Sequence, residues 1–96
     1  MASVRRAALK RKGIDSPETL NEFLSREFRR RRLFKKITMD VVAQNSGLSK
    51  GFICDFENTV RGISVQSWYS IIEAIEECPA TVLKRAIRDY EASLPI

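Results

Sequence analysis

Residues 38–58, TMDVVAQNSGLSKGFICDFEN, decide the fold of this chain. Thr38 and Ser49 are residue types that cap helix N-termini, and each precedes a short run with apolar residues at helical spacing. Asp40 falls in the first turn of the first run, where an acidic side chain favours helix formation. Gly47 separates the runs and can end the first helix in the left-handed conformation. The stretch therefore predicts two short helices joined by a tight turn.

The second of these helices has two chemically different faces. At about 100° per residue, apolar side chains fall within one arc and mostly polar or small ones on the opposite side. The inward arc holds Leu48, Phe52, Ile53 and Phe56, and the outward side holds Lys50, Gly51, Cys54 and Asn58. Ala43 is small enough for the second helix to cross close to the first. This pattern matches a helix-turn-helix, although an ordinary helical hairpin fits it too.

The rest of the chain predicts three more helices and no strand. Ser16-Pro17-Glu18 has the composition of a helix start, so the first helix should run from about Pro17 to Lys35. Ser64 should cap a fourth helix, and Pro79 should open a fifth over about residues 79–93. The expected buried stripes are Val65, Trp68, Ile71, Ile72 and Ile75 in the fourth helix and Val82, Leu83, Ala86, Ile87 and Tyr90 in the fifth.

We therefore predict an all-α fold made of one compact five-helix domain over residues 16–96. The helix-turn-helix should occupy about residues 38–58. Residues 1–15 are predicted to be a basic N-terminal arm, either flexible or a short helix. Ninety-six residues suit one hydrophobic core and leave no room for a second.

Composition excludes several classes of protein. The chain has no His, so it lacks the commonest general base and metal ligand. Its two cysteines, Cys54 and Cys78, cannot complete a tetrahedral zinc site without His and should be free thiols. No apolar run is long enough to span a membrane. We expect a cytoplasmic protein with no catalytic residues, no metal and no cofactor.

The positive charge lies in the first third of the chain. Residues 1–36 hold twelve basic and four acidic residues, whereas residues 37–96 hold five basic and eight acidic ones. Such a local excess favours a polyanion, and nucleic acid is the commonest one in cells, although anionic lipid is also possible. Arg29–Arg32 would place charge all round a helix instead of leaving the apolar face that a lipid-bound helix needs. The pattern favours nucleic acid.

The chain from about Phe23 to Leu83 resembles the lambda-repressor-like, Cro-type (XRE) helix-turn-helix DNA-binding family. The matching segments are Arg32-Leu33, Ile37-Thr38, Val42-Ala43, residues 47–50, Ile53, residues 56–58 and residues 61–64, followed by the apolar stripe of the fourth helix. Members of this family are common among phage, plasmid and restriction–modification regulators. The resemblance implies that this protein binds double-stranded DNA through the helix that follows Ser49.

The resemblance also implies which side chains read bases. The candidates are Ser49, Lys50, Gly51, Phe52 and Asp55. Lys50 can donate to guanine O6 or N7, or can meet only phosphate. Asp55 stands where an amide is frequent, and it can accept from cytosine N4 or pair with a neighbouring cation. Gly51 replaces a usually longer side chain, and Phe52 can touch a thymine methyl or pack in the core.

Other positions match phosphate-binding or structural residues of the family. The phosphate candidates are Thr38, Met39, Asn58 and Arg61, with Arg5, Arg6, Lys10 and Arg11 in the arm. Met39 stands where the family often has Gln, and its thioether has no N–H to donate to a phosphate. The arm can wrap DNA or serve only solubility. Arg32 and Glu57 match an ion pair that joins the first helix to the third.

Two functions remain in view. The first is a sequence-specific transcriptional regulator that works as a homodimer on a two-fold-related operator, because pairing doubles the few base contacts of one module. Its pairing surface would be the last helix or the loop from Val60 to Ile63. The second is an antitoxin-like or other protein-interaction module that binds a partner protein and its own promoter. The apolar last helix, ending in Leu94 and Ile96, motivates this alternative.

Overall fold

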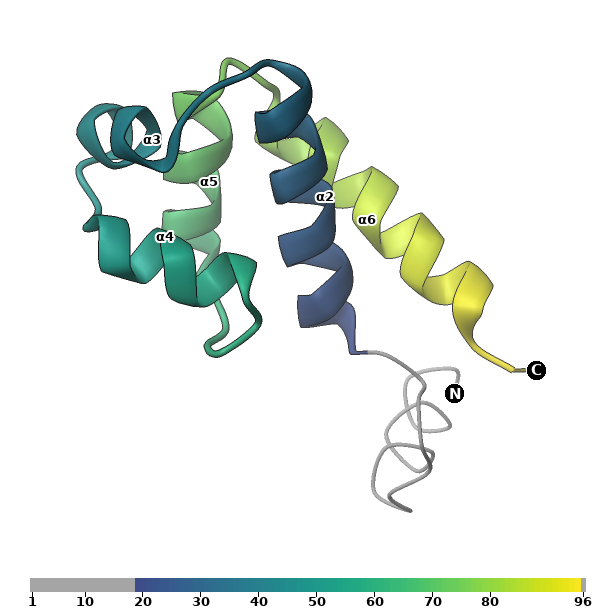
Figure 1. The fold of residues 1–96 in the computed structure, drawn as a ribbon. Helices are drawn as coiled ribbons and strands as arrows, with labels where there is room; N and C mark the ends of the chain where they lie inside the picture. Colours follow the sequence, from purple (N-terminus) through teal and green to yellow (C-terminus); the bar gives the residue numbers. More distant parts are fainter. Residues whose placement is uncertain (1–18, 96) are drawn as a thin grey trace.

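A computed structural model describes residues 19–95 of the chain, which contain five α-helices and no strand (Figure 1). The helices are α2 (Leu20–Phe34), α3 (Met39–Ser46), α4 (Lys50–Glu57), α5 (Val65–Ala74) and α6 (Pro79–Ser93). The predicted all-α fold is confirmed. The predicted arm over residues 1–15 lies outside the described residues.

Serine and threonine side chains cap the N-termini of α3, α4 and α5. The hydroxyl oxygens of Thr38, Ser49 and Ser64 each accept a hydrogen bond from the backbone N–H three residues further on, at 3.0–3.2 Å. Pro79 is the first residue of α6. These four helix starts agree with the sequence prediction. The three hydroxyl caps each satisfy a backbone donor that has no partner within its helix, and proline at the first position of α6 has no such donor.

The start of α2 differs from the prediction. The helix begins at Leu20 rather than at about Pro17, and its N-cap is Thr19. The Thr19 hydroxyl accepts from the Glu22 N–H at 3.2 Å, and the Glu22 carboxylate accepts from the Thr19 N–H at 2.6 Å. This reciprocal capping box satisfies two backbone donors at once and fixes the helix start. Ser16 and Pro17 lie outside the described residues.

The hydrophobic core forms where α3, α4 and α5 meet α2 and α6. In Figure 1, α3 and α4 lie on one side of the molecule and α6 on the other, with α2 and α5 between them. The buried cluster comprises Phe28, Val42, Ile53, Phe56, Trp68, Ile71, Ile72, Ala74, Ile75 and Val82. The prediction for Val65 was wrong, because its side chain is exposed. Val65 is the first residue of α5, and burial in this helix starts one turn later, at Trp68.

The apolar face of α6 packs against α2. Val82, Ala86 and Tyr90 are buried, and the Tyr90 ring meets the Phe23 ring edge-on, with centroids 5.8 Å apart. These three α6 residues thus belong to the core of the single chain and are not available for pairing with a second copy.

Among residues 19–95, no helix combines the length and the hydropathy needed to cross a membrane.

Candidate nucleic-acid interface

The turn between α3 and α4 holds α4 across α3. Gly47 ends α3 with φ of 77°, and its N–H donates to the Ala43 carbonyl at 3.0 Å. This φ lies in the left-handed region that only glycine adopts without strain. Val42 and Ile53 are fully buried beneath the turn, and Leu48 packs against the same cluster. The inner face of α4 is therefore fixed, and its outer face meets solvent.

Most of the base-reading candidates share this outer face. Ser49, Lys50, Gly51 and Asp55 are all exposed, whereas Phe52 is partly buried and packs against the core. A Cβ atom at Gly51 would meet only the Ser49 Oγ, at 4.0 Å. The scaffold itself therefore does not require glycine at this position. The structure exposes these four candidates on the segment that begins at Ser49.

An ion pair that the sequence did not reveal links the two helices on this surface. The Lys50 Nζ lies 3.2 Å from the Asp40 Oδ1, and the two side chains are 60% and 73% exposed. Lys50 is the only cationic residue between Ile37 and Val60, all of which the structure describes. Asp40 was interpreted only as a favourable helix-start residue. No periodic signal connects it to Lys50, because the two belong to different helices.

A second ion pair fastens the far end of α4 to α2. The Arg32 Nε lies 2.5 Å from the Glu57 Oε2, and the Arg32 Nη2 donates to the Glu57 Oε1 at 3.0 Å. A third guanidinium bond, from Nη1, reaches the Ile37 carbonyl at 2.7 Å. The side chains of Arg32 and Glu57 are only 8% and 1% exposed. This pair is a structural link, placed where the family resemblance implied one.

The phosphate candidates flank the outer face of α4. Thr38 is exposed at the start of α3, and Met39 is partly buried against the core. The Asn58 amide donates to the Cys54 sulfur at 3.4 Å, and the Arg61 guanidinium lies 4.6 Å from the centroid of the Phe52 ring. The sequence did not predict either contact. The arm candidates Arg5, Arg6, Lys10 and Arg11 lie outside the described residues.

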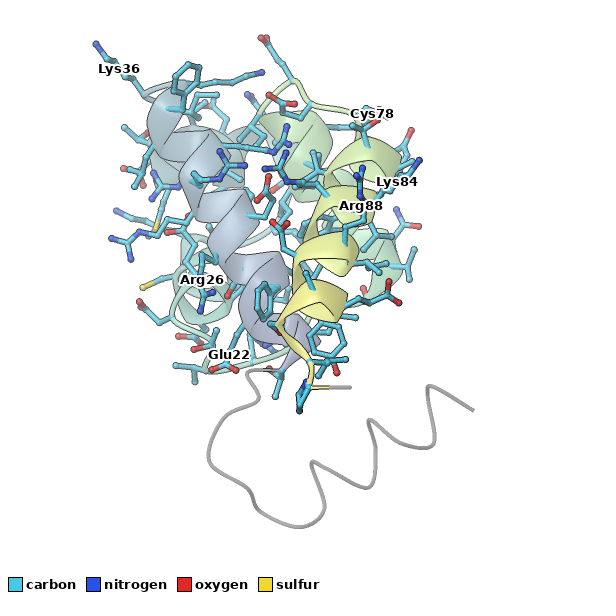
Figure 2. All side chains as sticks on the ribbon, turned by 90° about the vertical axis from the view of Figure 1, so that its right-hand side faces the viewer. Glu22, Arg26, Lys36, Cys78, Lys84 and Arg88 are labelled. Atoms are coloured by element: carbon cyan, nitrogen blue, oxygen red, sulfur yellow. The ribbon has the colours of Figure 1, made fainter. Side chains whose placement is uncertain are left out.

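The basic run in α2 is less evenly exposed than its sequence indicated. Arg29 and Arg30 are exposed, but Arg32 is buried and Arg31 is mostly covered. Arg31 contacts Glu27 at 2.6 Å and Glu77 at 3.0 Å. The exposed positive charge of α2 is thus confined to part of its surface. Figure 2 shows Arg26 on α2 and Lys36 just beyond the C-terminal end of that helix, with Lys84 and Arg88 on the neighbouring α6.

Glu27 is the buried carboxylate of this cluster. It accepts from Arg30 at 2.5 Å and from Arg31 at 2.6 Å. Burial raises the pKa of Glu27, but the hydrogen bonds from Arg31 and Arg30 outweigh it and hold the pKa below its ordinary value. Two of the arginines of α2 therefore serve the fold as well as the surface charge.

Basic residues of α2 also reach the C-terminal end of α4. Arg26 and Arg29 line a shallow hollow together with Glu57 and Thr59.

The two cysteines carry no disulfide, with Cys54 half-buried on α4 and Cys78 exposed. Within residues 19–95, no group of three acidic or sulfur side chains is arranged to hold a metal ion.

Three features define the lambda-repressor-like helix-turn-helix fold: the order of the helices, the glycine turn between α3 and α4, and the solvent-exposed outer face of α4. Solved structures agree with this assignment. The regulator ClgR from Corynebacterium glutamicum is 25% identical, with a TM-score of 0.72, and the match covers 80% of this chain and 82% of ClgR. The wild-type restriction–modification controller protein C.Esp1396I is 21% identical, with a TM-score of 0.70, over 78% and 97% of the two chains.

A third structure is a point mutant of C.Esp1396I bound to its highest-affinity operator site. It is 23% identical, with a TM-score of 0.70, and the match covers 77% of this chain and 97% of that one. No protein-family model and no curated protein matches the sequence. The resemblance to Cro-type regulators is thus confirmed at the level of the fold.

Proposed function

We propose that this protein is a sequence-specific DNA-binding transcriptional regulator of the phage, plasmid or restriction–modification-controller type. The observation that carries the proposal is the outer face of α4, which holds Lys50 and Asp55 in solvent while its inner face is locked into the core. Its structural neighbours are regulators, and one of them was crystallised on operator DNA.

In this proposal α4 enters the major groove of DNA. Lys50 donates to guanine O6 or N7, and Asp55 accepts from cytosine N4. The exposed N-terminus of α3 presents backbone N–H groups to a phosphate beside Thr38. Further phosphate contacts come from Asn58 and Arg61, from Arg26 and Arg29 near the end of α4, and from the basic arm.

The charge distribution supports backbone contacts from outside the helix-turn-helix. Between Ile37 and Val60 one cation, Lys50, faces three acidic residues. Attraction to the DNA backbone must therefore come from Arg61, from the exposed arginines of α2 and from the arm. Lys50 supplies sequence preference, and these flanking cations supply most of the salt-dependent affinity.

We further propose that the protein acts as a homodimer on a two-fold-related operator. Val60 and Val65 flank the loop between α4 and α5, and their side chains are 72% and 81% exposed. Exposed apolar residues beside the recognition helix suit a self-complementary contact that sets the spacing of two half-sites. Light scattering should report a dimer for the wild type and a monomer for the variant that combines Val60→Ser with Val65→Ser.

Selection of bound duplexes from a random pool tests the whole proposal. The selected sites should contain inverted half-sites, and affinity should fall steeply with salt. In the same assay Lys50→Ala should change the preferred base at one position per half-site, at about 1–3 kcal/mol of discrimination. Arg61→Ala is the matched control, because it should weaken all sequences alike and reduce the salt slope by about one. Binding that ignores salt would contradict the proposal.

The interaction-module alternative was motivated by the apolar last helix. The apolar face of α6 is occupied by α2, and Leu94 is partly buried. Ile96 lies outside the described residues. A DNA-binding regulator is therefore the function that the described part of the chain supports best.

A further inference from the structure

We propose that Asp40 is a specificity-determining residue, whose carboxylate aims Lys50 at a base and away from phosphate. The inference rests on the proposed function, since it concerns how the outer face of α4 reads DNA. It assigns a role to a residue that the sequence marked only as part of a helix start.

The geometry that carries the inference is the 3.2 Å contact between the Lys50 Nζ and the Asp40 Oδ1. Lys50 is the first residue of α4, and Asp40 is the second residue of α3. The backbone positions of both are fixed, because Ser49 and Thr38 cap the two helices and Gly47 sets the turn between them. The flexible lysine side chain thus has a defined partner on the neighbouring helix.

The chemistry of the ammonium group lets Lys50 keep this partner while it reads a base. A lysine ammonium has three N–H donors and no acceptor. One donor can stay on Asp40 while the others serve guanine O6 and N7, which lie side by side on the major-groove edge. Lys50 can therefore meet guanine without leaving Asp40 unpaired.

A phosphate is a poorer partner for the same arrangement. If Lys50 turns to the DNA backbone, it either abandons Asp40 or brings that carboxylate close to an anion. Like charges at such a contact are unfavourable and select against the competing mode of binding. Asp40 consequently lowers affinity for arbitrary sequences more than it lowers affinity for the operator.

The second exposed carboxylate, Asp55, does not share this role in the structure. It belongs to α4 itself, five residues after Lys50, whereas side chains of one helix that contact each other are three or four residues apart. The Lys50 ion pair is made with Asp40. The proposal therefore concerns the contact between the two helices and is separable from the base-reading role of Asp55.

The test is the variant Asp40→Asn, which keeps the side-chain shape and removes its charge. Binding to a selected operator duplex and to a scrambled duplex is measured over a series of salt concentrations. We expect the variant to bind the scrambled duplex several-fold tighter, and the ratio of operator to scrambled affinity to fall about tenfold. The salt slope on scrambled DNA should steepen by about one, because Lys50 becomes free to neutralise a phosphate.

The chain offers a matched control in Asp89→Asn. Asp89 also forms an exposed ion pair, with Arg85 at 3.4 Å, but it lies on α6 away from the helix-turn-helix. This variant should leave the affinity ratio unchanged. Thermal unfolding should show both variants folded at the assay temperature, with Asp40→Asn only slightly less stable because it removes a favourable first-turn charge, so that the binding data report on folded protein.

A double variant separates the proposed mechanism from a general charge effect. In a Lys50→Ala background, Asp40→Asn should still strengthen binding to all duplexes but should no longer change their ratio. An unchanged ratio in the single variant, or an equal fall in both backgrounds, would overturn the inference and leave the proposed function standing. A wild-type protein that selects no sequence from the random pool would overturn both.

Discussion

Two ion pairs hold α4, one at each end, and they differ in almost every physical respect. At the C-terminal end, Arg32 and Glu57 are desolvated and joined by two hydrogen bonds. At the N-terminal end, Lys50 and Asp40 make one contact in water. A buried pair is strongly destabilising when it is broken, whereas an exposed pair adds about 0–1 kcal/mol at most.

The difference shows how one short helix can be anchored at one end and exposed at the other, as the proposed reading of DNA requires. The buried pair cannot exchange partners, because any replacement would have to enter the protein interior. The exposed pair exchanges with solvent and with ligands at little cost. Stability of the scaffold and the proposed recognition of DNA thereby depend on opposite ends of α4, and substitutions can address them separately.

The largest effect is expected at the buried end. Arg32→Ala leaves Glu57 buried without its partner and removes the bond to the Ile37 carbonyl, so it should lower the free energy of unfolding by about 3–5 kcal/mol. Urea unfolding followed by circular dichroism measures this loss. Arg32→Met combined with Glu57→Leu should cost less than Arg32→Ala alone, since no uncompensated charge remains. A double variant as unstable as Arg32→Ala would contradict the view that the cost comes from an uncompensated buried charge.

An intermediate effect is expected at Glu27, which is buried while one of its two arginine partners is exposed. Glu27→Gln should cost about 1–3 kcal/mol at neutral pH. Because folding lowers the pKa of Glu27, its contribution is complete above the ordinary carboxyl pKa of 4.5 and is lost as pH falls through the lower folded value. The stability gap between wild type and variant should therefore narrow below pH 4.5. A difference in the free energy of unfolding that stays constant through acidic pH would show that the negative charge of Glu27 does not contribute to stability.

The smallest effect is expected at Gly51, beside Lys50 at the exposed end. The site is open to an added methyl group, so Gly51→Ala should raise the free energy of unfolding by up to about 1 kcal/mol through helix propensity. Thermal or urea unfolding resolves a gain of this size. A loss of stability would contradict the conclusion that the start of α4 has room for a methyl group at Gly51.

Local signals in the sequence were sufficient for most of the fold. Thr38, Ser49 and Ser64 start helices because a hydroxyl at that position satisfies the first backbone donors, and Gly47 ends one because it accepts positive φ. The start of α2 was misplaced because Ser16-Pro17-Glu18 and Thr19–Glu22 both carry start signals. The capping box of Thr19 and Glu22 is the one seen in the structure.

The site was less predictable, because its contacts join residues that no periodicity relates. Position within α4 was enough to place Lys50 and Gly51 on the exposed face, and the family resemblance added Asp55, which is exposed too. The partners of Lys50 and Arg61 were not foreseen. Asp40 approaches Lys50 only when the turn between α3 and α4 folds, and Arg61 approaches Phe52 only when the loop after α4 folds. Val65 was misplaced for a related reason, because helical spacing gives a direction but not the point where packing begins.

Trp68 gives this protein a built-in optical reporter. It is the single tryptophan of the chain, its indole N–H donates to the Pro79 carbonyl at 3.1 Å, and its ring meets Phe56 edge-on with centroids 6.3 Å apart. Its emission should be blue-shifted in the native protein and should move to the red when the contact between α4, α5 and α6 opens. Fluorescence can therefore follow the integrity of the scaffold during a DNA titration, with no added dye.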